Sequence, residues 1–289
     1  MTDFLEQVKL YLVQAQEGNA EISDAVVEEF KTACATLLKN AFSKQEPKVF
    51  THRVSSAGRP FCQQHMEKNG ALRSQEPYNT TMKFLIGDLI EAAAVAIMKG
   101  AGISVQEQQT QLKYKINDNV EINGSLDVVI GDKVYDIKST SPWSFTNKFA
   151  ASQGFALIVK DDAFGYLPQA YMYSEGRGLP FGGWIAINKA TGEWTVCSPP
   201  IADNMYRKQA LDKAKTNVEE LMSGAPFRRC FEAEEETWYG KKTGNKVLGI
   251  TCAYCAYKGP CWGGEVNYTV SPTSKSKNPQ KKWYIGNVA

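Results

Sequence analysis

The spacing of apolar residues predicts that the first hundred residues are mainly helical. Over residues 22–42 apolar side chains recur at three- and four-residue steps, which marks one face of a helix. A helix is also expected over 4–16, and a longer one over 78–99, which Gly100 and Gly102 end. We expect the 22–42 stripe to pack against the rest of the protein and to take no part in chemistry.

After residue 103 the pattern alternates, which is typical of strands. Strands are expected at 111–116, 120–130 and 133–139, with Gly131 and Asp132 forming a tight turn between the last two. A helix over 164–175, a hairpin of 181–188 and 193–198, and a helix over 201–222 follow. This order predicts an α/β fold with a helical N-terminal extension.

Composition places the chain among globular proteins, since 43% of its 289 residues are hydrophobic and 22% are charged. The longest apolar run is the seven residues 92–98, far short of the ~20 that cross a bilayer, so no membrane span is expected. The N-terminus lacks the basic-then-apolar layout of a signal peptide. These features predict a cytoplasmic protein.

Charge and histidine content narrow the possible chemistry. The 33 basic and 31 acidic residues give a net charge of +2, so a nucleic-acid role needs a local basic groove or metal ions that bridge acids to phosphates. Two histidines leave little material for a histidine-based triad. No P-loop glycine–lysine motif is present, so we expect no ATPase activity of its own.

The predicted hairpin at 120–139 carries the strongest catalytic signal. Asp136 and Lys138 project from the same face of the second strand, and the tight turn brings Asp127 beside them. Two converging carboxylates favour a hard cation such as Mg²⁺, and a neighbouring lysine can hold a water or offset charge on a phosphate. Taken alone, the same pattern also fits charges exposed at a strand end.

Two further positions add to this signal. Glu91 is followed by a wholly apolar helical turn, so it faces either solvent or a metal. Gln169 and Tyr173 are four residues apart and share one helical face. Such a pair can grip a phosphate backbone or stack near a base, and the alternative is a surface glutamine beside a tyrosine at the edge of the core.

In this order and spacing the residues resemble the PD-(D/E)xK nucleases of the RecB-like branch, whose members share four ordered motifs. The four are matched by Gly87 with Glu91, Gly124 with Asp127, Asp136-Ile137-Lys138, and Gln169 with Tyr173. Many relatives carry histidine where this chain has Glu91.

The resemblance implies a restriction-endonuclease-like core, a central mixed β-sheet flanked by helices, and Mg²⁺- or Mn²⁺-dependent hydrolysis of DNA. In that family pattern the metal ligands would be Glu91, Asp127, Asp136 and the carbonyl of Ile137. Lys138 would position the attacking water, and Gln169 and Tyr173 would orient the DNA strand.

Seven cysteines in a chain without an export signal favour metal ligation or burial over disulfides. Cys252, Cys255 and Cys261 have the spacing C-x2-C-x5-C. Three ligands are one short of four, so a fourth must come from another cysteine. Cys34 and Cys197 lie in apolar patterns typical of a core, which leaves Cys62 or Cys230. Four thiolates suit either Zn²⁺ or a 4Fe–4S cluster.

Here too the resemblance is informative, because RecB-like nucleases with an iron–sulfur cluster hold it with one cysteine before the core and three after it. That pattern implies a 4Fe–4S cluster on Cys62, Cys252, Cys255 and Cys261, with zinc as the alternative. Such a centre would have a structural role and would close a loop of about 200 residues.

We therefore expect one nuclease domain over 1–289, with a helical extension at 1–50, the nuclease core at 51–225, and a Cys-rich segment with a basic tail at 226–289. In that tail Lys275, Lys277, Lys281 and Lys282 accompany Trp283 and Tyr284, with little to build a core from. The tail is either solvated or a DNA contact.

The expected function is a DNA exonuclease of the kind that phages use in recombination or DNA degradation. It would act in the cytoplasm (the host cytoplasm if phage-encoded), alongside recombination or replication proteins. One alternative is a CRISPR-adaptation nuclease, against which the chain length and the extra N-terminal helices stand. Another is an inactive DNA-binding or assembly module, against which the intact Asp127, Asp136 and Lys138 set stands.

Overall fold

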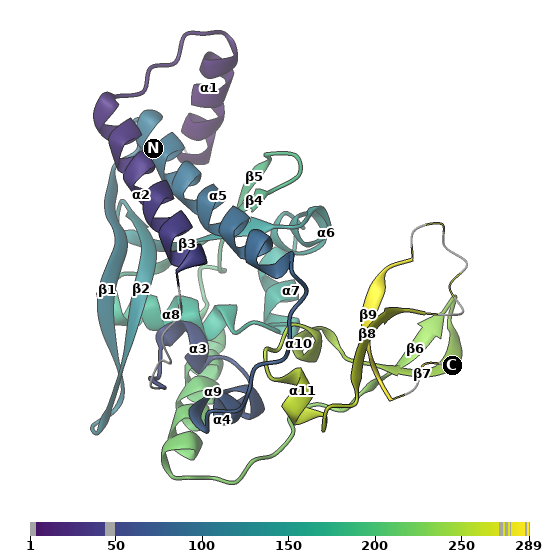
Figure 1. Cartoon of the computed structure of the whole chain (residues 1–289). Coiled ribbons are helices and arrows are strands. Elements are labelled where there is room, and N and C mark those ends of the chain that lie inside the picture. The colour runs from purple at the N-terminus through teal and green to yellow at the C-terminus, as the bar shows by residue number, and fades with distance from the viewer. Residues whose placement is uncertain are drawn as a thin grey trace.

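The computed structural model describes residues 4–43, 50–271, 274, 277, 279–286 and 288, and these form two β-sheets with helices around the larger one (Figure 1). The helices are α1 Phe4–Gln16, α2 Asp24–Phe42, α3 Val54–Ala57, α4 Phe61–Lys68, α5 Thr80–Gly100, α6 Pro142–Ser144, the π-helix Phe145–Phe149, α7 Gly154–Lys160, α8 Tyr166–Arg177, α9 Asn204–Met222, α10 Ile250–Ala253 and α11 Lys258–Cys261. The strands are β1 Val105–Asn117, β2 Val120–Ile130, β3 Lys133–Thr140, β4 Phe181–Asn188, β5 Trp194–Cys197, β6 Glu234–Trp238, β7 Lys241–Val247, β8 Val266–Val270 and β9 Lys281–Ile285.

The first sheet is mixed, with strand order β1-β2-β3-β4-β5. The antiparallel β2–β3 hairpin turns at Gly131 and Asp132, as the sequence predicts, and Ile130 pairs with Lys133 across the turn. Strand β3 then pairs with β4 in parallel, which requires the long connection through α6, the π-helix, α7 and α8. Strand β3 is therefore the central strand of the sheet.

Helices cover both faces of this sheet. On one face α1 and α5 pack Val8 and Met98 against side chains of the sheet such as Val128 and Ile185. On the other, α8 and α9 contribute to a larger cluster that contains the fully buried Trp184. The predicted α/β class, with a mixed central sheet and a helical N-terminus, is confirmed. No helix in the described part of the chain is long and apolar enough to span a membrane.

Helix α2 packs against the rest of the protein as expected, but its apolar stripe is only partly buried. It lies along α5 (Figure 1), and none of its residues is buried. Leu38 is 47% exposed and Phe42 is 71% exposed. With a single helix as its main neighbour, the stripe is only half covered. Its other side borders the cleft described below.

The C-terminal region also differs from the expected tail. Residues 234–285 contain four antiparallel strands in the order β6-β7-β9-β8. Strand β9 pairs on both sides, and Tyr284 is only 1% exposed, so Trp283 and Tyr284 belong to a sheet rather than to a solvated tail. Lys275 lies outside the described residues.

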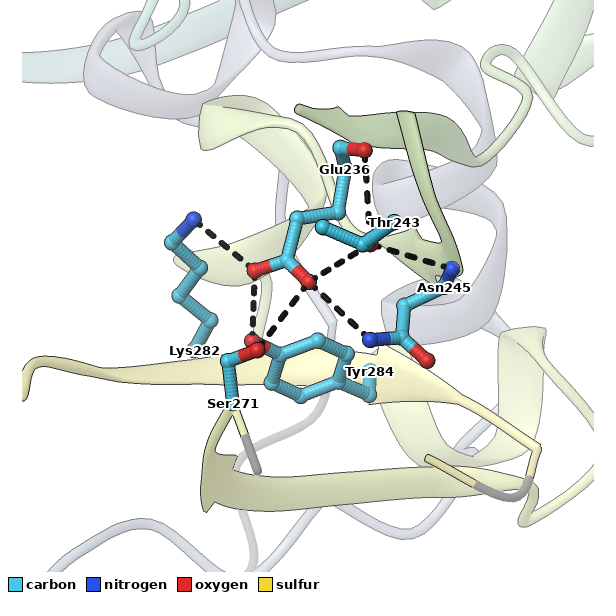
Figure 2. Close-up of polar contacts among 6 residues, drawn as sticks. All are labelled: Glu236, Thr243, Asn245, Ser271, Lys282 and Tyr284. Carbon is cyan, nitrogen blue, oxygen red and sulfur yellow. Dashed lines mark hydrogen bonds and ion pairs between the residues drawn. The ribbon is translucent and has the colours of Figure 1, made fainter. Parts of the chain in front are cut away.

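The buried carboxylate of Glu236 lies at the middle of one face of this second sheet, where a hydrophobic side chain is usual (Figure 2). One carboxylate oxygen of Glu236 accepts hydrogen bonds from Tyr284 Oη (2.7 Å) and Lys282 Nζ (3.2 Å). The other accepts from Thr243 Oγ1 (2.9 Å), Asn245 Nδ2 (3.1 Å) and Ser271 Oγ (3.4 Å). Burial opposes the charge of Glu236, but these donors outweigh it and lower the pKa of Glu236 to about 2. The carboxylate thus joins β6, β7, β9 and the residue that follows β8.

Candidate functional site

A cleft of about 930 Å³ runs along the first sheet and contains most of the predicted catalytic residues. Its walls come from α2, α3 and the segment before it, α5, β1, β2, β3 and α8. The predicted residues that line it are Glu91, Asp127, Ile137, Lys138, Gln169 and Tyr173. Asp136 lies beneath the surface, only 2% exposed.

Asp136 and Lys138 form an ion pair on the central strand. Lys138 Nζ lies 2.7 Å from one Asp136 oxygen and 2.9 Å from the other. It also sits 5.1 Å from the centroid of the Tyr166 ring on α8. Burial disfavours the charged ammonium, but the Asp136 and Asp127 carboxylates outweigh it and raise the pKa of Lys138. Lys138 is therefore held as a cation with a fixed direction.

Asp127 is placed where β2 and β3 separate. The two strands pair as far as Val128 and Tyr135, and the Asp127 carboxylate then accepts the N–H of Ile137 at 2.8 Å. Burial, followed by the charges of Asp136 and Glu91, raises the pKa of Asp127 well above its ordinary value. A carboxyl group this crowded by like charges favours either a proton or a cation.

Glu91 reaches the same site from α5. It is half-buried and accepts a hydrogen bond from the side-chain amide of Gln109 on β1. Burial and the charge of Asp136 raise the pKa of Glu91 to about 7. Ser125 Oγ donates to the Gln109 oxygen at 2.9 Å, which fixes the amide. No sequence motif pointed to Gln109.

Tyr173 and Gln169 extend the site along α8. Tyr173 is 3% exposed and hydrogen-bonds Gln169, and burial raises the pKa of Tyr173 to about 12. A Cβ atom on Gly124 would lie 2.6 Å from the Tyr173 ring and 2.8 Å from Val54, so only glycine lets this ring approach the strand. By contrast, a Cβ atom on Gly87 would meet nothing within 4 Å.

The donor set suits a hard divalent cation, because three carboxylates from α5, β2 and β3 interact electrostatically within one partly closed site. As they lie, each carboxylate has a hydrogen-bonding partner from the chain: Gln109 for Glu91, the Ile137 N–H for Asp127, and Lys138 for Asp136. Consistent with this, no three His, Cys, Asp or Glu side chains of the described residues are arranged to hold a metal ion. Cation binding would therefore draw oxygens away from these partners.

The four cysteines of the predicted metal centre surround one small cavity. Cys62 comes from α4, Cys252 from α10, Cys261 from α11, and Cys255 from the turn between the last two helices. Burial raises the pKa of the Cys252 thiol to about 11, so these side chains are thiols in the absence of a metal. Four cysteine side chains suit zinc or an iron–sulfur cluster. In the described residues, however, no three of these thiols are arranged as the ligands of a metal ion.

The other three cysteines divide as follows. Cys197 is buried on β5, as its predicted core position requires, whereas Cys34 is only half-buried, on a helix without a buried residue. Cys230 is exposed, and its sulfur accepts the backbone N–H of Cys62 at 3.2 Å. The competitor for the fourth ligand thus lies directly beside Cys62, although it does not line the cavity.

The cysteine-bearing turn contacts both the second sheet and the segment that precedes α5. Trp283 and Ile285 of the second sheet pack against the cluster of Leu248, Cys252 and Trp262. Lys258 is 1% exposed, pairs with Glu76 before α5, and lies 4.6 Å from the Trp283 ring centroid. These contacts connect the second sheet to the segment that precedes α5.

Several site residues have no sequence motif that would have revealed them. Arg53 brings a second cation to the cleft, and Thr36 and Leu37 of α2 form part of its wall. The serine pair that follows Arg53 divides its roles: Ser55 lines the cleft, whereas Ser56 hydrogen-bonds the backbone of Arg53 at the start of α3.

Comparisons with known proteins give little similarity. Neither a scan of family models nor a search of curated proteins found a match. Among solved structures, the protein described as "Crystal structure of SSO0001" is similar with a TM-score of 0.43 and 14% sequence identity, over 79% of this chain and 93% of that chain. A likeness at this level does not bear on the chemistry of the cleft.

Proposed function

We propose that the protein is a Mg²⁺- or Mn²⁺-dependent DNA exonuclease of the RecB-like PD-(D/E)xK type. The observation that carries this proposal is that Glu91, Asp127 and Lys138 meet in one cleft from three separate elements, with Asp136 buried beneath it and paired with Lys138. Three crowded carboxylates with one buried lysine are suited to phosphodiester hydrolysis with a bound cation.

In this proposal the cation is held by Glu91, Asp127, Asp136 and the Ile137 carbonyl. Bound there, it would supply a Lewis acid for the phosphate and lower the pKa of a water. Lys138, which lies beside Asp136 on the same strand, would hydrogen-bond the attacking water and offset the charge that develops on the phosphate.

Substrate positioning falls to the residues along the cleft. Gln169 and the Tyr173 hydroxyl can donate hydrogen bonds to a phosphate, and Arg53 offers a charged contact to the same backbone. Apart from Arg53 and Lys138 the lining side chains are neutral or acidic, so much of the neutralisation of the DNA would come from the cation.

We also propose that Cys62, Cys252, Cys255 and Cys261 hold a 4Fe–4S cluster, with zinc as the alternative. The shared cavity of these four side chains supports this assignment. Its role would be structural, because it lies among α4, α10 and α11 rather than in the cleft. The biological setting, phage-type recombination or DNA degradation in the cytoplasm with recombination or replication partners, is proposed on the resemblance of the motifs.

Digestion of end-labelled DNA tests the proposal. Linear and closed circular DNA, single- and double-stranded, are incubated with the protein and Mg²⁺ or Mn²⁺. Loss of linear but not circular DNA is the expected result. Cutting of circles would replace the exonuclease by an endonuclease. No cleavage under any condition, together with DNA binding, would favour the inactive binding module.

A further inference from the structure

The turn of the β6–β7 hairpin presents two aromatic side chains on the outside of the second sheet. The turn consists of Tyr239 and Gly240, because Trp238 pairs with Lys241 across it. Tyr239 is 93% exposed and Trp238 is 37% exposed. Their rings meet edge to face, with centroids 5.4 Å apart and an interplanar angle of 83°. Neither the proposed cleft nor the cysteine cavity uses these residues.

The backbone at Tyr239 is unfavourable for its side chain. Tyr239 has φ 48° and Gly240 has φ 76°, so both central residues of this two-residue turn are left-handed. Asn, Asp or Gly usually occupies the first of these positions, and a residue with a bulky side chain loses about 1–2 kcal/mol there. A ring that is almost fully exposed recovers little of that energy by packing. The fold itself therefore gives no reason for tyrosine at this position, which points to a role outside the fold.

The charge around the turn is positive. Lys241 and Lys242 are exposed and make no ion pair within the described part of the chain. Residues 226–289 contain ten Lys and Arg against five Glu, whereas the remaining residues have a small excess of acids. The exposed Glu234 and Glu235 lie at the other end of β6, and Glu236 is buried. The tip of the hairpin is thus aromatic and basic, without an acid of its own.

We infer that this turn is a nucleic-acid contact separate from the cleft, and that its ligand is single-stranded DNA. Stacking on Tyr239 and Trp238 needs base faces that a duplex does not offer, and Lys241 and Lys242 supply contacts to phosphate. Figure 1 shows β6 and β7 on the opposite side of the molecule from β1 and β2, which border the cleft. If the protein is the proposed nuclease, the turn would hold a long DNA strand at a distance from the site of cleavage, and this role rests on the proposed function.

Binding measured without cleavage tests the inference. A fluorescent thirty-nucleotide oligothymidine is titrated with full-length protein in buffer free of divalent cations, and its anisotropy is followed. Tyr239→Asn should weaken binding about 5-fold or more, because stacking is lost. Tyr239→Phe is the matched control and should bind as the wild type does. Changing Lys241 and Lys242 to Gln should lower the slope of log affinity against log salt by about 1.4.

Misfolding does not explain the expected result, because Asn suits the turn and Tyr239→Asn should unfold at the same or a higher temperature than the wild type. Wild-type affinity in Tyr239→Asn, or no binding by the wild-type protein, would overturn the inference. Loss of binding in Tyr239→Asn from a protein that never cleaves DNA would support the inference while refuting the proposed nuclease. Cleavage of DNA by the wild-type protein, together with unchanged binding in Tyr239→Asn, would support the proposed nuclease and refute the inference.

Discussion

Replacing Glu236 by Gln should destabilise the second sheet at neutral pH and matter much less in acid. The surrounding donors lower the pKa of Glu236 from 4.5 to about 2. With about 1.4 kcal/mol for each pH unit of that difference, ionisation contributes roughly 3 kcal/mol to the free energy of unfolding. Because the pKa is lower in the folded state, this contribution is complete above about pH 4.5 and is lost as the pH falls toward 2.

Urea unfolding followed by tryptophan fluorescence measures the effect, since Trp238, Trp262 and Trp283 belong to this region. The loss in Glu236→Gln should be roughly 3 kcal/mol at pH 7 and about half of that at pH 3. Glu235→Gln, an exposed neighbour on the same strand, is the control and should change the free energy by less than about 0.5 kcal/mol at either pH. An equal loss in Glu236→Gln at both pH values would show that its shape, rather than its charge, stabilises the sheet.

Two further predictions concern the glycine motifs and the cysteines. Gly124→Ala should cost about 1–3 kcal/mol of stability and reduce cleavage, because its Cβ atom would displace Tyr173. Gly87→Ala has open space around it and should stabilise α5 by up to about 1 kcal/mol. Urea unfolding and DNA digestion measure both variants, and equal effects at the two positions would show that packing against Tyr173 is not the reason for Gly124. Protein purified without oxygen should be brown, with absorbance near ~400 nm and about four irons per chain. Serine at Cys62, Cys252, Cys255 or Cys261 should remove the colour and lower the melting temperature, while serine at Cys34, Cys197 or Cys230 should keep it. A colourless protein with one zinc would reject the cluster, and bleaching in the Cys230 variant alone would move the fourth ligand to Cys230.

The sequence was informative where local pattern and burial agree. Gly131 and Asp132 mark a two-residue turn between two strand-like segments, so the register of the β2–β3 hairpin follows from the turn, and the common face of Asp136 and Lys138 follows from the two-residue period of a strand. The convergence of Glu91 from α5 depended on matching ordered motifs, because no local rule places a helix residue beside a strand residue. The partner of Glu91, Gln109, depends on a tertiary contact and has no local signal.

The second sheet was missed for two physical reasons. Its strands are short and polar, and the centre of one face is the buried carboxylate of Glu236 instead of a hydrophobic side chain. Its pairing is also non-local, because β7 pairs with β9 across the cysteine-bearing turn. Lys281 and Lys282, at the start of β9, consequently read as a basic tail. Helix α2 packs along α5 as expected, but its apolar stripe shows only that a face avoids water and not how much of that face is covered.

The rate at which Lys138→Ala degrades end-labelled linear DNA in Mg²⁺, relative to the wild-type protein, decides whether the cleft hydrolyses phosphodiester bonds. Lys138 is the only lysine that lines the described cleft, and it forms an ion pair with the buried Asp136. The folded variant should bind DNA and lose cleavage by about 100-fold or more. Cleavage by Lys138→Ala at the wild-type rate would contradict the assignment of the cleft as the site of phosphodiester hydrolysis.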